Sequence, residues 1–501
     1  MVAAWHGPKP KVAIIGAGFG GLCMGIRLKE AGCDSFEIFD RSAGVGGVWH
    51  DNVYPGAGCD IPAHLYSYSF EKYREPGKRF PDQAYTLDYL RRCVDRHGLG
   101  PHLRLNTEIA RLRFDEPAGQ WRLWTTGGDE HVADVVISAV GQLSRPRYPD
   151  IPGRDDFAGL SFHSSRWPGD LDVTGRDVAV IGNGSSAAQL IPAIAPRVRR
   201  LYAFQRSPTW VLAKSPLEFG RGFSLAFRSL PFTHDLYRSV LSWRAERLLL
   251  PALHQGWTAR FLRKMAVSHL NKQVPDPELR ERLLPDYPIG CKRIVISSDY
   301  YPALARDNVE VVTEKIVQVT PEGIQSDGEL RTVDTIVYAT GFHSTEFLEP
   351  LEVIGRDERT LSGQWEKGAR AYLGMAAPNF PNLFFMYGPN TNLGHNSIIY
   401  VLEAQAGYIT ACLREMAANG GGTLEARPEA LEEWVRLVEA GMGSTVWTAD
   451  CTNWFKNAAG TVVNNWPYRT ARYRKLVRRP QMADFRFTRA PSERTVWVTD
   501  R

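Results

Sequence analysis

Two glycine-rich turns, each directly after a short apolar run, constrain the fold of this chain more than any other feature. The first run, Lys11–Ile15, leads into Gly-Ala-Gly-Phe-Gly-Gly, and the second, Asp177–Ile181, leads into Gly-Asn-Gly-Ser-Ser-Ala. A buried strand, such a turn and a helix form a dinucleotide-binding unit, because the glycines let the backbone approach a pyrophosphate at the helix start. Two units predict an α/β fold with two Rossmann-like dinucleotide-binding domains. The turn residues expected to bind nucleotide are Gly16, Gly18, Gly21, Gly182, Gly184 and Ala187.

The second strand of each unit ends in a different kind of residue. Phe36–Phe39 is followed by Asp40, whose carboxylate is well placed to accept hydrogen bonds from a ribose. Arg200–Phe204 is followed instead by Gln205 and Arg206. An arginine there suits a 2′-phosphate, because its planar fork donates to two phosphate oxygens at once. We therefore expect the second unit to select NADPH over NADH; the alternative is a surface arginine without a ligand.

A third motif lies between the two units. Residues 157–168 read Phe-Ala-Gly-Leu-Ser-Phe-His-Ser-Ser-Arg-Trp-Pro, which has the form FxGxxxHxxxWP. This spacing resembles the fingerprint of the type I Baeyer–Villiger monooxygenases, flavoproteins that use NADPH and O2 to insert oxygen beside a ketone carbonyl. The alternative is an aromatic linker with one buried histidine. From its position we expect the motif to couple the domains rather than to bind substrate, through Phe157, Gly159, His163, Trp167 and Pro168.

A second signature of the same family follows the first unit. Residues 46–60 match GGxWxxxxYPxxxxD, with Gly47, Trp49 and Asp60 among the fixed positions. The resemblance implies that this loop lies along the flavin and that Asp60 orients an active-site arginine. A packed surface turn is the alternative interpretation of these residues.

The resemblance also implies a reaction. NADPH would reduce FAD, and the reduced flavin would capture O2 as a C4a-peroxide, which as the anion attacks a ketone to give an ester or lactone. Arg293, in a Lys-Arg pair that matches the family's catalytic segment, is the candidate that holds the peroxide as the anion, because a guanidinium stays charged. Lys292 is a second candidate contact to the 2′-phosphate. An ordinary surface dipeptide is the alternative for this pair.

Two further residues are candidates for cofactor binding. Gly341 belongs to Ala-Thr-Gly-Phe, a motif shared by the broader flavin monooxygenases. Asn396 lies in a glycine- and asparagine-rich turn before a helix predicted from Ile398, and such a turn directs N–H groups at the flavin pyrimidine or at phosphate. A plain helix cap is the alternative for the second site.

The motifs divide the chain into parts. Leucine, arginine and aromatic residues recur at helical spacing from Leu217 to Leu284, which predicts a helical insertion. We expect the FAD-binding domain in 1–145 and 344–501, the NADPH-binding domain in 146–212 and 289–343, and the insertion in 213–288. An aromatic group in the last part either caps a substrate pocket or is core: Trp447, Cys451, Trp454, Phe455, Trp466 and Pro467.

Two other functions remain open at this point. An N- or S-oxygenating or aliphatic-hydroxylating flavin monooxygenase is the first, although such relatives usually lack the Trp167-Pro168 pair. A redox sensor that binds nucleotides without turnover is the second. The ketone itself and the oligomeric state are not predicted.

Composition excludes several classes of protein. The net charge of +5 is small for 501 residues, and no apolar run is long enough for a membrane helix. Without a signal-peptide pattern we expect a cytoplasmic protein, and we expect no nucleic-acid or membrane partner despite a basic C-terminal region. The seven cysteines are scattered and form no CxxC pair, so we expect reduced thiols and no metal site.

Overall fold

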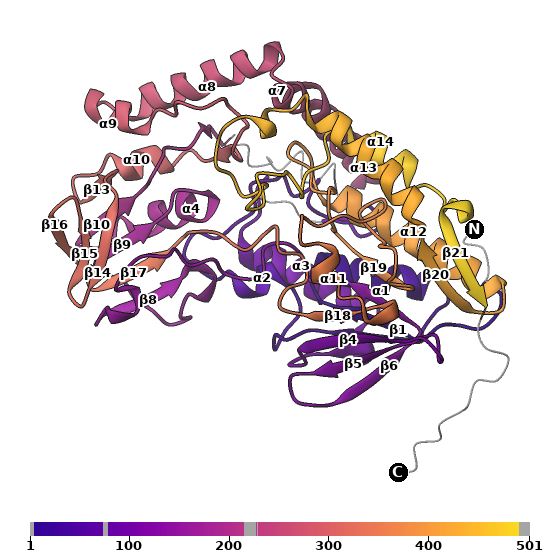
Figure 1. Ribbon diagram of the computed structural model, residues 1–501. Helices are drawn as coiled ribbons and strands as arrows, with labels where there is room; N and C mark the ends of the chain where they lie inside the picture. The colour runs from indigo at the N-terminus through magenta and orange to yellow at the C-terminus, as the bar shows by residue number, and fades with distance from the viewer. Residues whose placement is uncertain (1–4, 74–78, 215–226, 228, 490–501) are drawn as a thin grey trace.

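The first of two parallel sheets begins with the strand that enters the first glycine turn. The computed structural model describes residues 5–73, 79–214, 227 and 229–489 (Figure 1). All four residues of the first strand are buried, as expected where helices cover both faces of a parallel sheet. In the order β19-β7-β1-β2-β3, the strands are Leu383–Phe385, Val135–Ser138, Val12–Ile15, Phe36–Phe39 and Leu103–Arg104. The helices α1 (Phe19–Glu30) and α3 (Gln83–Arg96) accompany this sheet, and we call the whole the first module.

The second sheet repeats the same arrangement. In the order β13-β10-β9-β17-β8, its strands are Val309–Val312, Arg200–Phe204, Asp177–Ile181, Thr335–Tyr338 and Leu160–His163. The helices α4 (Ser185–Ile194) and α10 (Tyr300–Leu304) pack beside it, and we call this unit the second module. Its edge strand β8 comes from the FxGxxxHxxxWP motif, which therefore forms part of a sheet.

Each module carries an antiparallel excursion directly before the strand that pairs with its glycine-turn strand, which is β7 in the first module and β17 in the second. In the first module β4 (Ile109–Asp115), β5 (Gln120–Thr125) and β6 (Glu130–Ala133) are joined by β18 (Glu352–Ile354). In the second module the excursion is β14 (Ile316–Thr320), β15 (Gly323–Ser326) and β16 (Glu329–Thr332). The repeated excursion extends the similarity of the two modules beyond their glycine turns.

A group of helices is inserted into the sequence of the second module, where the helical spacing predicts them. It contains α6 (Pro231–Arg244), a π-helical turn (Ala245–Leu249), α7 (Leu250–Leu253), α8 (Trp257–Gln273) and α9 (Pro277–Leu283). The short strands β11 (Val211–Leu212) and β12 (Val295–Ile296) pair in parallel where the insertion leaves and rejoins the module. Leu217 and the rest of residues 215–226 lie outside the described residues.

The C-terminal third returns to the first module. Strand β19 joins the first sheet beside β7, and α12 (Ile399–Ala418) packs against α1. The predicted helix start at Ile398 is the N-cap of α12. The remaining elements are β20 (Gly422–Ala426), α13 (Pro428–Met442), α14 (Thr470–Leu476), β21 (Phe485–Arg489), and the short helices α2 (Val48–Asp51) and α11 (Leu361–Gln364).

The two parallel sheets share one strand arrangement and confirm the predicted α/β fold with two Rossmann-like domains. The domain boundaries predicted at residues 145, 212, 288 and 343 stay a prediction. Across the described part of the chain, no helix has the length and apolar character needed to cross a membrane.

Candidate active site

One cavity of about 1380 Å³ lies where the two modules meet, and both glycine turns open into it. The predicted site residues that line it are Gly16, Gly18, Asp40, Gly47, Trp49, Asp60, Gly182, Gly184, Arg206, Lys292, Arg293, Gly341 and Asn396. Gly21 and Ala187 are not among the lining residues. Instead they lie where α1 and α4 approach their sheets, so the third motif position in each turn has a packing role.

The first turn is tied to the end of β2. Gly16 has φ of +108°, and a Cβ there would lie 2.5 Å from the carbonyl oxygen of Ala139. The Asp40 carboxylate accepts hydrogen bonds from the backbone N–H of Ala17 at 2.6 Å and of Ser42 at 2.8 Å. Asp40 therefore also holds the turn in place, while it lines the cavity as predicted for a ribose ligand.

The GGxWxxxxYPxxxxD loop lies against this turn. A Cβ on Gly47 would lie 3.2 Å from the Cα of Gly18, so the two glycines bring the loop and the turn together. Trp49 donates from its ring nitrogen to the hydroxyl of Tyr66 at 3.2 Å. The loop thus forms a wall of the cavity next to the first turn.

The second turn has two cationic side chains beside it. Gly182 has φ of +119°, and a Cβ there would lie 2.3 Å from the carbonyl oxygen of Ala339. Arg206 is exposed just beyond β10, and Lys292 donates to the hydroxyl of Ser207 at 2.6 Å. Burial, together with the charge of Arg206, lowers the pKa of Lys292. Two like charges held this close favour an anionic ligand between them.

Arg293 and Asp60 form an ion pair across the boundary between the modules. One terminal nitrogen of Arg293 lies 2.9 and 2.8 Å from the two carboxylate oxygens, and Nε lies 3.3 Å from one of them. The Asp60 charge raises the pKa of the guanidinium, which stays protonated. The Arg293 side chain is still 35% exposed and lines the cavity. The arginine is therefore oriented by one partner and open to a ligand on another side.

Known proteins resemble this chain over most of its length. Residues 13–211 match the family model for pyridine nucleotide-disulphide oxidoreductases. A Baeyer–Villiger monooxygenase of Streptomyces coelicolor is 42% identical over 96% of this chain and 94% of its own length. A Baeyer–Villiger monooxygenase of Pseudomonas aeruginosa is 40% identical over 96% of this chain and 92% of its own. This chain belongs to the Baeyer–Villiger monooxygenase family.

Solved structures agree with the family. A crystal structure of OTEMO in complex with FAD and NADP superposes with a TM-score of 0.86 at 29% identity. The alignment covers 96% of this chain and all of that one. The predicted family, fold class and enzyme class are confirmed, whereas the roles given to individual residues stay predictions.

In this Baeyer–Villiger monooxygenase the fingerprint contacts the cavity only indirectly. His163 is buried, with Nε2 at 2.9 Å from the carbonyl oxygen of Gly341 and Nδ1 at 2.9 Å from the hydroxyl of Ser165. The carbonyl can only accept, so Nε2 carries the proton. Burial lowers the pKa of His163 to about 4, which leaves the ring neutral. The motif thus supports the backbone of Gly341, a residue of the cavity wall.

The other fingerprint residues fix the strand. Trp167 is buried against Phe162, with ring centroids 5.3 Å apart. A Cβ on Gly159 would lie 2.6 Å from the carbonyl oxygen of Asp334, so a side chain does not fit there. Phe157 is half-buried beside the second sheet, and Pro168 is exposed. Coupling between the modules stays a prediction for these residues.

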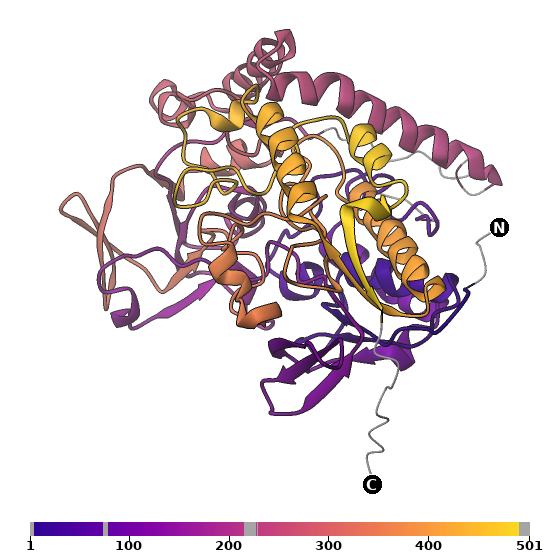
Figure 2. The ribbon, with the colours of Figure 1, turned by 45° about the vertical axis from the view of Figure 1, so that its right-hand side comes forward.

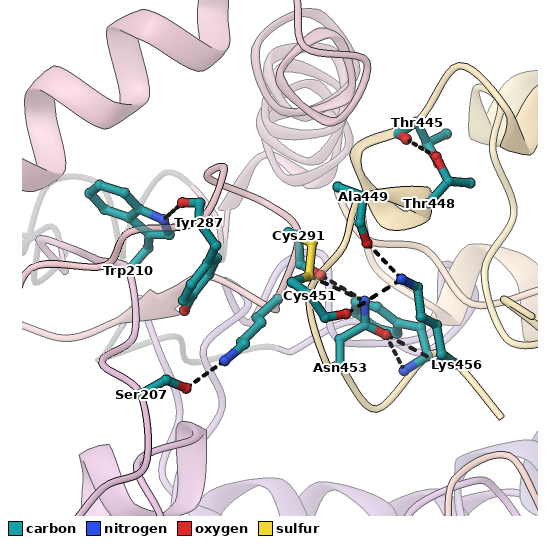
Figure 3. Close-up of a disulfide and its surroundings, with 12 residues drawn as sticks. Ser207, Trp210, Tyr287, Cys291, Thr445, Thr448, Ala449, Cys451, Asn453 and Lys456 are labelled. Carbon is teal, nitrogen blue, oxygen red and sulfur yellow. Dashed lines mark hydrogen bonds between the residues drawn. A yellow bond between two sulfur atoms is a disulfide. The ribbon is translucent and has the colours of Figure 1, made fainter. Parts of the chain in front are cut away.

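The prediction that all cysteines are reduced is wrong for two of them. Cys291 and Cys451 form a disulfide across 160 residues of sequence, directly before the Lys292-Arg293 pair (Figure 3). Asn453 donates to the carbonyl oxygen of Cys291 at 3.0 Å beside the bond. Sequence spacing cannot reveal this pair, because only the fold brings the C-terminal loop to the segment that carries Lys292 and Arg293. The other five are free and buried: Cys23, Cys33, Cys59, Cys93 and Cys412.

The C-terminal aromatic group divides into core and cavity wall. Trp447, Phe455 and Trp466 are fully buried in the core of the first module. Trp454 instead lines the cavity, on the loop that the disulfide holds. Asn396 also lines the cavity, and its amide donates to the hydroxyl of Ser242 in the helical insertion at 3.0 Å.

Sequence reasoning missed one residue of the junction, Gln189. This side chain of α4 donates to the carbonyl oxygen of Gly58 at 2.8 Å and accepts from the hydroxyl of Tyr54 at 2.9 Å. It therefore ties the second module to the loop that carries Asp60. The only signal in the sequence is a glutamine among the apolar residues of a helix that follows a glycine turn.

Proposed function

We propose that this protein converts ketones to esters or lactones, with FAD in the first module and NADPH in the second. The observation that carries the proposal is the Arg293–Asp60 pair, which is presented to a cavity that both glycine turns line. A small-molecule ketone and O2 are the other reactants. The structure of OTEMO, which resembles this chain and holds FAD and NADP, supports the choice of cofactors.

The residues of both modules fit such cofactors. A Cβ built on Gly141, Gly184 or Gly341 would meet no heavy atom of the described residues within 4 Å, so the cavity reaches the backbone at these glycines. Bare backbone N–H groups at a helix start suit a pyrophosphate. Arg206 and Lys292 supply the positive charge that a 2′-phosphate needs in the second module.

The chemistry that bound FAD and NADPH supply is hydride transfer and the activation of O2. The task of Arg293 is electrostatic. Its permanent charge, directed by Asp60, stabilises negative charge that develops on the ketone oxygen during nucleophilic addition. Asp60 prevents the guanidinium from turning away, so the donor is already oriented when that charge forms.

Substitution of Arg293 tests the proposal. Loss of a preorganised oxyanion donor costs about two to three decades in kcat. Arg293→Ala should therefore still be reduced by NADPH and still consume O2, but release H2O2 in place of ester. Arg293→Lys should recover only part of the ester yield, because lysine keeps the charge and loses the planar fork. Asp60→Ala should lie between wild type and Arg293→Ala.

Stopped-flow absorbance of the flavin, with ester and H2O2 quantified in parallel, gives the result. Lys292→Met is the matched control, since it removes the adjacent charge and should raise the KM for NADPH without changing the ratio of ester to H2O2. A normal ester yield from Arg293→Ala would contradict the proposal and favour oxygenation of nitrogen or sulfur.

A further inference from the structure

Helix α6 of the insertion presents its apolar side to solvent. The exposed fractions of its residues are 63% for Phe232, 61% for Leu236, 45% for Val240 and 60% for Trp243. Their spacing of three or four residues places all four on one face of the helix. Single exposed apolar residues are common on protein surfaces, but a continuous apolar stripe marks an interaction site.

The inner side of α6 carries two buried polar residues, His234 and Arg238, beside the buried Leu241. Arg238 is 5% exposed, and its Nη1 donates to the backbone carbonyls of His64 at 2.8 Å and Ser67 at 2.6 Å. Its guanidinium also lies over the ring of Tyr400, 4.6 Å from the centroid. These bonds fix which side of the helix faces the first module. The apolar side consequently cannot turn inward without breaking them.

Helix α8 repeats the exposed stripe. Trp257, Phe261 and Met265 are 66%, 50% and 45% exposed, and they are spaced four residues apart. The opposite side of α8 is also apolar and is buried through Leu262, Ala266 and Leu270. Figures 1 and 2 show the insertion along one edge of the molecule, at the top of both views. We call the seven exposed apolar residues of α6 and α8 the insertion face.

Positive charge surrounds the insertion face. The exposed basic residues from α6 to α8 are Arg244, Arg247, Arg260, Arg263, Lys264 and Lys272. Among the described residues from α6 to α8 the exposed acid is Asp235, which is paired with Lys72 at 2.6 Å. The other exposed acids of the insertion lie on or beside α9: Asp276, Glu278, Glu281 and Asp286. Glu246 is directed inward, where it accepts from the backbone N–H of Thr470 at 2.9 Å. From α6 to α8 the exposed surface is therefore apolar and cationic, and its exposed acid Asp235 is paired with Lys72.

We infer that the insertion face binds the surface of an anionic phospholipid bilayer. Tryptophan, phenylalanine and leucine beside lysine and arginine are the side chains by which amphipathic helices lie in the interface, with apolar groups among the acyl chains and cations at the phosphates. A second copy of this chain fits less well, because a two-fold interface would bring the cationic groups of one copy against those of the other. The binding is peripheral and goes beyond the catalytic function proposed above.

Co-sedimentation of the full-length holoenzyme with vesicles tests the inference. Vesicles of phosphatidylcholine and phosphatidylglycerol in equal parts should bind the protein, and vesicles of phosphatidylcholine alone should not. Raising the salt concentration should weaken the binding. Arg260→Gln, Arg263→Gln and Lys264→Gln together should lower the partition coefficient about a hundredfold, at about fivefold for each basic residue.

The apolar contribution needs its own variants. Phe232→Ser with Trp243→Ser should lower partitioning at least about tenfold, since both side chains would enter the bilayer. Leu330→Ser is the matched control, because Leu330 is 46% exposed on the antiparallel excursion of the second module, away from the insertion. Thermal unfolding should stay unchanged in each variant, as each replaces an exposed side chain.

Three outcomes would overturn the inference. The first is no binding to anionic vesicles, and the second is equal binding to both kinds of vesicle by wild type and variants. The third is a dimer in solution that dissociates when Phe232 and Trp243 are replaced, which would make the insertion face a contact between copies.

Discussion

The two modules have the same strand order but obtain their fifth strand from different places. In the first sheet it is β19, from the C-terminal third of the chain, and in the second it is β8, from the fingerprint motif. Phe385 of β19 lies beside Ser138, and His163 of β8 lies at the corresponding position beside Tyr338. At this equivalent position of the fifth strand, the first module has a phenylalanine and the second has a hydrogen-bonding histidine.

The strand ends differ in the same way. The registers of the two sheets align Asp40 with Gln205 and Arg41 with Arg206. Both arginines are exposed and line the cavity, but Arg41 is engaged by Asp51 at 3.6 Å and by the carbonyl oxygen of Ser144 at 3.0 Å. If FAD and NADPH bind as proposed, the shared backbone would fix where each nucleotide lies, and a few side chains at equivalent positions would decide which nucleotide it is.

The largest difference should come from the third position of each glycine motif. A Cβ on Gly21 would lie 1.8 Å from the carbonyl oxygen of Gly16, whereas Ala187 already accommodates a methyl group at the equivalent place. Gly21→Ala should consequently prevent the first module from packing and yield protein without FAD. The reciprocal Ala187→Gly should cost only about 1 kcal/mol of stability.

Bound flavin per chain and the melting temperature are the measurements. A Gly21→Ala protein with a full complement of FAD and an unchanged melting temperature would show that the two modules tolerate the same turn, and that part of the comparison would fail.

The next effect in size concerns the cations of the second module. Loss of a charge-assisted contact to phosphate costs about 1.5–3 kcal/mol. Arg206→Ala should therefore raise the KM for NADPH by about one to two decades, at about 1.4 kcal/mol per decade, and leave NADH nearly unaffected. Steady-state kinetics with both cofactors measures the effect. Arg200→Ala is the control, since Arg200 is exposed at the other end of the same strand. Equal losses with NADPH and NADH would show that Arg206 does not bind the 2′-phosphate.

Local sequence was sufficient to predict the fold, because the pattern that identifies each module spans only a few consecutive residues. Strand, glycine turn and helix are contiguous, so the pattern at Gly16 and at Gly182 specifies both sheets. The helix predicted from Ile398 also follows its glycine- and asparagine-rich turn directly, and Ile398 is the N-cap of α12. Family resemblance added the pairing of Arg293 with Asp60, which lie 233 positions apart in the chain.

Contacts between distant segments could not be read from the sequence. The disulfide joins Cys291 to Cys451 only because the C-terminal loop returns to the segment before Arg293. Gln189 contacts Gly58 for the same reason, as two modules are docked there. The sequence predicts that the fingerprint couples the domains, but its place as an edge strand depends on pairing with β17, which is far along the chain.

A smaller effect should follow when the fifth strands are made alike. His163→Phe copies Phe385 and leaves the half-buried carbonyl of Gly341 without its donor, which costs about 1 kcal/mol. We expect lower stability, full retention of FAD and turnover slowed by the same factor for every ketone. Ser165→Ala is the control, because it leaves the bond from Nε2 intact. A changed ranking of substrates at an unchanged overall rate would show that the fingerprint acts on substrate.

The smallest effect is the pH dependence that His163 adds to the second module. Burial lowers its pKa from 6.5 to about 4, so between these values the unfolded chain binds a proton that the folded chain does not. The contribution of the neutral ring to stability is thus complete above about pH 6.5 and decreases as the pH falls toward 4, by up to about 1.4 kcal/mol per pH unit. Phenylalanine does not titrate. The difference in unfolding free energy between wild type and His163→Phe should therefore shrink by about 1.4 kcal/mol between pH 7.5 and pH 5.5, as measured by denaturant unfolding. A difference that stays constant over this range would mean that His163 is not neutral and buried in solution, and that the two fifth strands differ less than their positions suggest.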